Sequence, residues 1–159
     1  MATWAEFASD QPELAAYGWE LLREDQGYAY LATVSPGGSP RVHLVVPFVA
    51  EGNLYVSIVA ASPKVADLRG NPRYMLYATV GDNDTEFAVR GHAVELVDRV
   101  AHDRVLEHQE LNVAELHADC VLFALDLDRV DAAIWDDGPP HRQTWRTAQR
   151  TPAASSTAR

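Results

Sequence analysis

The residues best suited to chemistry lie between positions 41 and 64. Arg41 and His43 alternate on one expected strand, Ser57 lies on the next, and Ser62-Pro63-Lys64 then opens a short expected helix. A helix N-terminus presents unpaired N–H groups and the positive end of the helix dipole, and both attract phosphate. Hydroxyl, ammonium and guanidinium groups nearby would add charge-assisted hydrogen bonds. The pattern indicates a mononucleotide-phosphate site, and the alternative is an ordinary helix start with a solvated Lys64.

The elements that must position these residues follow from changes in hydrophobic period. A helical period runs from Pro12 to about Asp25, and capping-box spacing from Thr3 to Glu6 indicates an earlier helix start. Strands are expected at residues 28–34, 41–50, 54–59, 73–80, 85–97, 120–127 and 129–135, and helices at 62–70 and 99–116. Pro47 predicts a bend in the second strand, and Gly91 predicts a bulge in the fifth.

This element order predicts a mainly β (α+β) fold. Many expected strands with only a few helices among them favour an antiparallel barrel of six to seven strands with flanking helices over a βαβ fold. A chain of 159 residues is long enough for one well-buried domain, which we place at residues 1–146. Residues 147–159 are rich in Thr, Ala, Ser and Arg, so we expect them to form a disordered tail.

Composition excludes several classes of partner. The 23 acidic residues outnumber the 13 basic ones, giving a net charge of −10 that argues against nucleic acid as a partner. Cys120 is the single cysteine and cannot form an intramolecular disulfide. No segment reads as a signal peptide or a membrane span, so we expect a cytoplasmic protein. The histidines at 102, 108 and 117 lack the spacing of a metal site, so we expect them on a solvated helix face and expect no metal.

Four blocks of sequence resemble the pyridoxamine 5′-phosphate oxidase-like superfamily. Their order and spacing match that family across residues 31–34, 36–47, 52–57 and 62–73. The segment Val89-Arg90-Gly91-His92-Ala93-Val94-Glu95-Leu96 is also similar to the family's long strand with a central glycine. The resemblance covers residues 25 to 98 well and the remainder by element order. It implies a split β-barrel homodimer with two flavin sites at the subunit interface.

The resemblance also implies roles for individual residues. Arg41, Val42, His43, Leu44 and Val45 would hold the isoalloxazine ring through backbone and side-chain contacts, and Ser57, Ser62 and Lys64 would hold the ribityl-phosphate. Pro63 replaces a basic residue that the family often has at the helix start. Either Arg41 or Arg69 could supply the missing donor.

The function implied by the resemblance is an FMN-binding oxidoreductase acting on an unidentified small molecule. The alternatives are an F420-dependent reductase of the same fold, a non-catalytic flavin- or haem-binding protein, or a barrel that has lost its cofactor. No catalytic residue stands out, because a flavin would carry the hydride chemistry itself. Trp135 and Trp145 could stack on such a ring or pack in the core. The full substrate-phosphate pattern of the true pyridoxamine phosphate oxidases is not visible in the C-terminal region.

Overall fold

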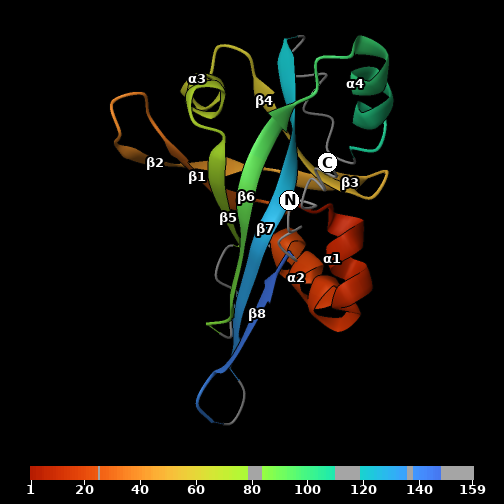
Figure 1. The fold of residues 1–159 in the computed structure, drawn as a ribbon, viewed down its shortest axis with the longest axis vertical. Helices are drawn as coiled ribbons and strands as arrows, with labels where there is room; N and C mark the ends of the chain where they lie inside the picture. Colours follow the sequence, from red (N-terminus) through yellow and green to blue (C-terminus); the bar gives the residue numbers. More distant parts are fainter. Residues whose placement is uncertain (25, 79–83, 110–118, 136–137, 148–159) are drawn as a thin grey trace, which may run out of the picture.

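The fold is seen in a computed structural model that describes residues 1–24, 26–78, 84–109, 119–135 and 138–147. Its strands form one antiparallel sheet, and its helices lie around that sheet (Figure 1). The elements in chain order are α1 (Trp4–Asp10), α2 (Pro12–Glu24), β1 (Ala29–Val34), β2 (Pro40–Val45), β3 (Pro47–Ala50), β4 (Asn53–Val59), α3 (Pro63–Gly70), β5 (Arg73–Ala78), β6 (Glu86–Glu95), α4 (Arg99–Leu106), β7 (Cys120–Ile134) and β8 (His141–Arg146).

The sheet curls into a half-barrel. Its strand order is β2-β1-β5-β6-β7-β4-β3, and β8 pairs with β7 outside this path. Strands β2 and β3 are consecutive in the chain but lie at opposite ends of the order, so the sheet must curl to bring its ends together. The predicted split antiparallel barrel is therefore confirmed.

The break between β2 and β3 lies at the predicted bend. Pro47 begins β3, where its missing N–H and fixed φ interrupt a strand that the sequence predicted as continuous over 41–50. The bend separates two environments, because β2 pairs with β1 whereas β3 pairs with β4. The residues expected to bind the ring therefore lie on a strand at one edge of the sheet.

The predicted bulge at Gly91 is also present. The register of β6 against β7 shifts between Arg90 and Gly91, which leaves Asp128 as the extra residue on β7. A Cβ atom on Gly91 would lie 1.8 Å from the backbone oxygen of Asp126, so only glycine fits this close approach. Sequence reasoning had divided β7 near Asp128. The structure shows one strand of 15 residues there, because β7 accommodates the extra residue without ending.

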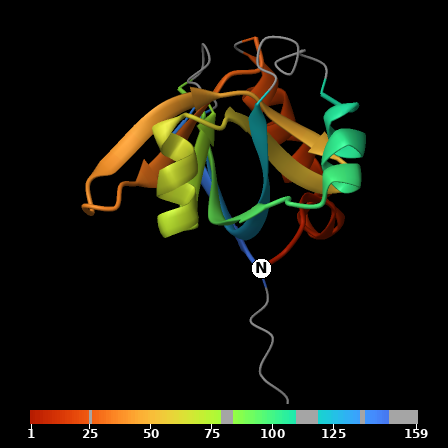
Figure 2. The same cartoon turned by 90° about the horizontal axis from the view of Figure 1, so that it is seen from above.

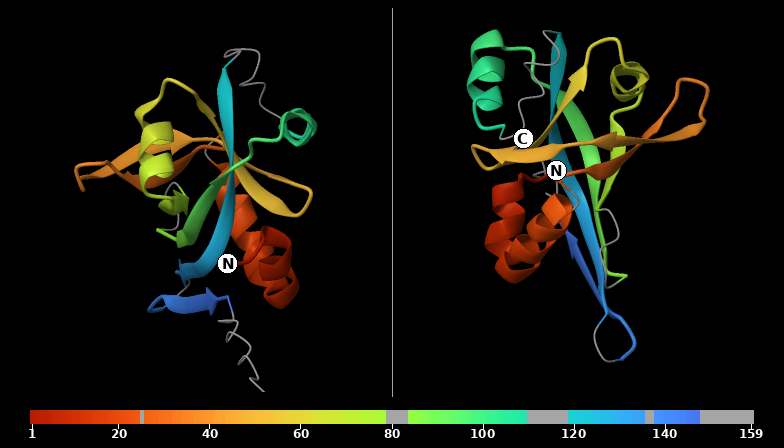
Figure 3. Two further views of the ribbon diagram at one scale, coloured as in Figure 1. Left: turned by 45° about the horizontal axis from the view of Figure 1, so that its top comes forward. Right: turned by 180° about the vertical axis from the view of Figure 1, so that it is seen from behind.

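Helices α1 and α2 pack together against one side of the sheet, as both views in Figure 3 show. The capping box predicted at Thr3 and Glu6 starts α1. Phe7 of α1 is fully buried, and its ring lies 5.1 Å from that of Trp145 on β8. Trp145 donates its indole N–H to Asp10 at 3.1 Å, so it packs in the core.

Helices α3 and α4 lie on opposite sides of β6 and β7 when the molecule is viewed from above (Figure 2). Helix α4 starts at the N-cap Asp98 and ends at Leu106. The predicted helix over 99–116 was too long, because residues 107–109 are not helical, and residues 110–116 of that prediction lie outside the described residues. Most of the expected tail and the last residues of the strand predicted over 73–80 also lie outside the described residues. Strand β8 was not predicted, because its sequence is polar and only Trp145 in it is buried.

Candidate functional site

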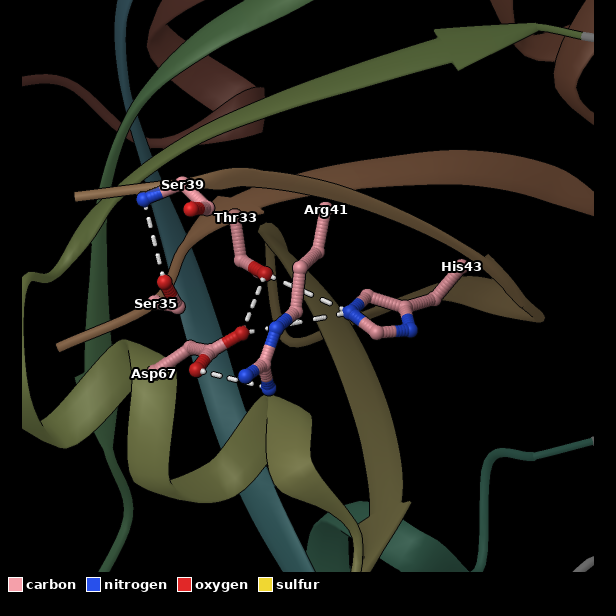
Figure 4. Close-up of polar contacts among 6 residues, drawn as sticks. All are labelled: Thr33, Ser35, Ser39, Arg41, His43 and Asp67. Atoms are coloured by element: carbon pink, nitrogen blue, oxygen red, sulfur yellow. Dashed lines mark hydrogen bonds and ion pairs between the residues drawn. The ribbon is translucent and has the colours of Figure 1, made fainter. Parts of the chain in front are cut away.

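Arg41 and His43 project from the same face of β2 toward helix α3. Their partners across the β1–β2 ladder are Thr33 and Leu31, which are buried. Because directly paired residues on antiparallel strands share a face, Arg41 and His43 lie on the inner side of the hairpin. The sequence predicted this pair, and the structure brings the two side chains together (Figure 4).

The centre of the cluster is Asp67 of α3, whose side chain is completely buried. One carboxylate oxygen accepts a hydrogen bond from the Thr33 hydroxyl at 2.8 Å, and the other accepts one from Nη1 of Arg41 at 3.3 Å. Nε2 of His43 lies 3.3 Å from the Thr33 hydroxyl and 4.0 Å from the carboxylate. Figure 4 shows these four side chains converging from β1, β2 and α3. Asp67 thus fixes the positions of both predicted β2 residues.

The start of α3 supplies further donors. Ser62 is the N-cap, as predicted, but its side chain does not make the capping hydrogen bond. Lys64 is half-buried in the first turn, and burial lowers the pKa of its ammonium group. Burial also lowers the pKa of His43, and the charge of Lys64 lowers it further. The positive charge of Lys64 therefore acts on the imidazole of His43.

Ser57 lies on β4, on the face opposite its core neighbours Val56 and Ile58. Its hydroxyl oxygen is buried and has no hydrogen-bond partner within the described part of the chain. A buried polar atom without a partner costs stability of about 1–3 kcal/mol, which a bound acceptor or donor would recover. Ser57 does not join the hydrogen-bonded cluster around Asp67, but its orphaned hydroxyl fits a phosphate-bearing ligand.

The remaining predicted residues of β2 divide between two environments. Val42 and Leu44 point to the outer face of the sheet and are 64% and 54% exposed, whereas Val45 is buried in the core. Tyr30, which pairs with Leu44 across the ladder, is 43% exposed on the same outer face. Side chains of β2 therefore serve two surfaces, a polar inner cluster and an apolar outer row.

Two of the residues that complete the cluster were not predicted. Asp67 follows Lys64 by three positions, a spacing that places both on one face of a helix, and this was the signal available. Thr33 could be found only from the register of β1 against β2. Arg69, an alternative phosphate donor in the sequence, makes two hydrogen bonds to Glu95 at 2.7 and 2.8 Å. Arg41 is therefore better placed than Arg69 to act as the phosphate donor.

Other residues considered in the sequence lie elsewhere in the fold. No group of three metal-ligating side chains occurs among the described residues. His102 was expected on a solvated helix face, but it is buried, and its Nε2 lies 3.3 Å from the backbone oxygen of Cys120. Trp135 is 45% exposed at the end of β7. Within the same residues, no helix is long and apolar enough to cross a membrane.

Comparison with known proteins identifies the sequence family. The family model described as pyridoxamine 5′-phosphate oxidase matches residues 5–132. A search of curated proteins found no match.

Solved structures share the fold at low sequence identity. A pyridoxamine 5′-phosphate oxidase-related, FMN binding protein from Nostoc punctiforme is 19% identical with a TM-score of 0.69, covering 84% of this chain and 88% of that one. General stress protein 26 from Bacillus anthracis is 19% identical with a TM-score of 0.59, covering 82% and 98%. A heme binding protein from Mycobacterium smegmatis is 18% identical with a TM-score of 0.58, covering 80% and 57%.

Proposed function

The chain belongs to the pyridoxamine 5′-phosphate oxidase family, and we propose that it is an FMN-dependent oxidoreductase acting on a small molecule. The observation that carries this proposal is the convergence of donors at the start of α3. Lys64 lies in the first turn of that helix, where its charge acts on His43, and Arg41 is held to the same helix by Asp67. In a protein with a net charge of −10, such a concentration of cationic groups favours an anionic ligand.

Each group has a defined task in this proposal. Lys64 and the hydroxyl of Ser62 would bind the phosphate together with the N–H groups at the start of α3. Arg41 would bind the phosphate or the pyrimidine edge of the ring, and the orphaned hydroxyl of Ser57 would gain a partner. FMN, when bound, supplies the hydride and electron transfer. The protein would supply the position of the ring.

Strand β2 is suited to bind the isoalloxazine ring along residues 41–45. It lies at the end of the strand order, so one edge of its backbone has no neighbouring strand in the sheet. Exposed strand edges present N–H and C=O groups that can pair with a ligand. Because His43 projects from the same strand, its imidazole would lie beside the bound ring.

A homodimer with the cofactor at the subunit interface completes the proposal. Tyr30, Val42 and Leu44 form an exposed apolar row on the outer face of β1 and β2. Clusters of exposed apolar side chains of this kind mark interaction surfaces. Val42 and Leu44 lie on the same strand as Arg41 and His43. A second copy bound to this row would therefore lie next to the cluster around Asp67.

The test is an absorbance spectrum of the purified protein, followed by titration with FMN and F420 side by side. We expect FMN to bind, and Lys64→Ala to weaken its binding by about 1.5–3 kcal/mol, the value of a charged hydrogen bond. Arg99→Ala is the matched control, because Arg99 is an exposed cation at the start of α4. Binding of F420 alone would assign deazaflavin chemistry instead, and binding of neither would overturn the proposal.

A second candidate is a non-catalytic flavin- or haem-binding protein. The similarity of the fold to a heme binding protein favours this candidate. Turnover separates it from the first: an oxidoreductase loaded with FMN should be reduced by NAD(P)H or by a substrate and then reoxidised. A protein that holds its cofactor tightly and is not reduced would be a carrier, store or sensor.

A further inference from the structure

A cavity lies away from the cluster around Asp67, where α2 ends and β2 bends into β3. Its volume is about 450 Å³, within the range of small-molecule sites. None of its described lining residues belongs to the cluster around Asp67. The residues that line it are Trp19, Arg23, Gln26, Gly27, Val46, Pro47, Phe48, Val49 and Gln109.

The walls of this cavity favour a flat and largely apolar ligand. One wall is the run of apolar residues 46–49 at the β2–β3 bend. The lining also includes Trp19, and the guanidinium of Arg23 lies over its indole, 5.7 Å from the ring centroid. An aromatic ring packed against these side chains gains both dispersion contacts and burial of apolar area.

The polar side chains in the lining are Arg23, Gln26 and Gln109, and the amide of Gln109 is the buried one. Both its Nε2 and its Oε1 are buried, and neither has a hydrogen-bond partner among the residues the structure describes. The backbone of Gln109 is fixed, since its N–H donates to the carbonyl of Leu106 at 3.0 Å and that of His108 donates to Val105 at 3.1 Å. Val105 is itself buried in the core. The amide is therefore held at the cavity by a packed helix end.

We propose that this cavity binds a planar small molecule carrying an amide, primary or cyclic. Such a ligand offers one N–H donor and one carbonyl acceptor side by side, which match the two unpartnered atoms of Gln109. A ligand with only one of these groups would leave one polar atom of the buried Gln109 amide without a partner. The free-energy cost of that unpaired atom makes the site select ligands that carry both groups. The site is separate from the flavin-phosphate site proposed at Lys64.

The probe for this site is benzamide, a flat ring with one carboxamide. Binding would be followed by calorimetry and by the side-chain amide signals of Gln109 in nitrogen-15 NMR spectra. We expect benzamide to shift those signals, and acetophenone, which keeps the carbonyl and lacks the N–H donors, to bind at least ten-fold more weakly. Absence of benzamide binding up to its solubility limit would overturn the proposal.

Two variants test the role of Gln109. Gln109→Leu should weaken benzamide binding at least ten-fold and raise the Tm of the free protein, because it removes a buried amide that has no partner. Gln143→Leu is the matched control, since Gln143 is exposed on β8, and it should leave benzamide binding unchanged. Equal affinity in wild type and Gln109→Leu would overturn the assignment. Lys64→Ala should also leave benzamide binding unchanged. Weaker benzamide binding in this variant would show that the two sites are not separate.

Discussion

Asp67 is the residue on which the geometry of the cluster with Thr33, Arg41 and His43 depends. Its completely buried carboxylate accepts a hydrogen bond from Thr33 at 2.8 Å and a longer one from Arg41 at 3.3 Å. Removing one partner from a buried hydrogen-bonded charge leaves the others unsatisfied, which costs more than the bond itself is worth. The cluster therefore couples the stability of the β1–β2 hairpin to the arrangement of the groups that would bind phosphate.

We expect Asp67→Ala to lower the free energy of unfolding by about 2–4 kcal/mol, and Asp67→Asn by ~1–2 kcal/mol because asparagine keeps one acceptor oxygen for Thr33. Both variants should also weaken FMN, since Arg41 loses the group that holds it. Urea denaturation and an FMN titration measure the two effects. A double-mutant cycle with Thr33→Val isolates the buried hydrogen bond. Full FMN affinity in Asp67→Asn would show that Arg41 needs no such support.

His43 makes the site sensitive to pH. Burial lowers its pKa, the charges of Lys64 and Arg41 lower it further, and Asp67 partly opposes them. Between this lowered pKa and the ordinary value of ~6.5, the unfolded chain binds more protons than the folded one. We therefore expect this histidine to remove stability as the pH falls below about 6.5, and His43→Gln to reduce that loss. Urea midpoints measured from pH 7.5 down to 5 give the slope.

The same histidine reports on the bound anion. A phosphate beside Lys64 brings negative charge to the imidazole, so FMN should raise the pKa of His43. NMR titration of its ring protons, with and without FMN, measures the change. His92 serves as the internal control, because it lies on β6 and contacts Asp128 rather than the cluster. A pKa of His43 that does not move on FMN binding would place the phosphate elsewhere.

The sequence identified the parts of this cluster that have a local signature and missed the parts that depend on tertiary structure. Arg41 and His43 alternate along a strand, and Ser62 and Lys64 mark a helix start, so each pair is visible in a few consecutive residues. Asp67 resembles any acidic residue on a helix surface until the helix is placed against β1. Val42 and Leu44 were assigned to the ring, and the structure places their side chains on the outer face.

At the scale of elements, the bulge where β7 passes Gly91 of β6 sets the path of the central strands. Gly91 allows β6 and β7 to approach where their register shifts. We expect Gly91→Ala to lower the free energy of unfolding by about 2–4 kcal/mol, because its Cβ would overlap the backbone of β7, which cannot move alone. Gly70→Ala is the control: a Cβ there meets nothing within 4 Å, so the change should be neutral or slightly stabilising. Thermal unfolding of both variants measures the difference.

Prediction of the elements succeeded where the hydrophobic period or a proline gave a clear signal. The capping box at Thr3, the bend at Pro47 and the bulge at Gly91 all lie where the sequence placed them. Strand β8 was missed because exposed polar residues fill it, and it is a strand because β7 offers an edge for pairing. Such pairing depends on the partner strand more than on the sequence of β8 itself.

At the scale of the whole molecule, the curled sheet gives β2 two functions. Arg41 and His43 on its inner face belong to the cluster around Asp67. Val42 and Leu44 on its outer face form the apolar row with Tyr30. The β1–β2 hairpin extends away from the body of the molecule beside α3, as Figure 2 shows. A second copy seated on the hairpin would cover the apolar row and enclose the edge strand that is proposed to bind the ring.

Leu44→Asp therefore tests the dimer and the cofactor site together. A carboxylate in the apolar row would have to be buried without a partner in the proposed interface, so we expect this variant to be monomeric and to bind FMN at least ten-fold more weakly. Val97→Asp is the matched control, because Val97 is 83% exposed and follows β6, away from the row. Light scattering after size-exclusion chromatography gives the mass of each variant. A dimeric Leu44→Asp protein would move the interface off β2, whereas a monomer that keeps full FMN affinity would show that one chain forms the whole site.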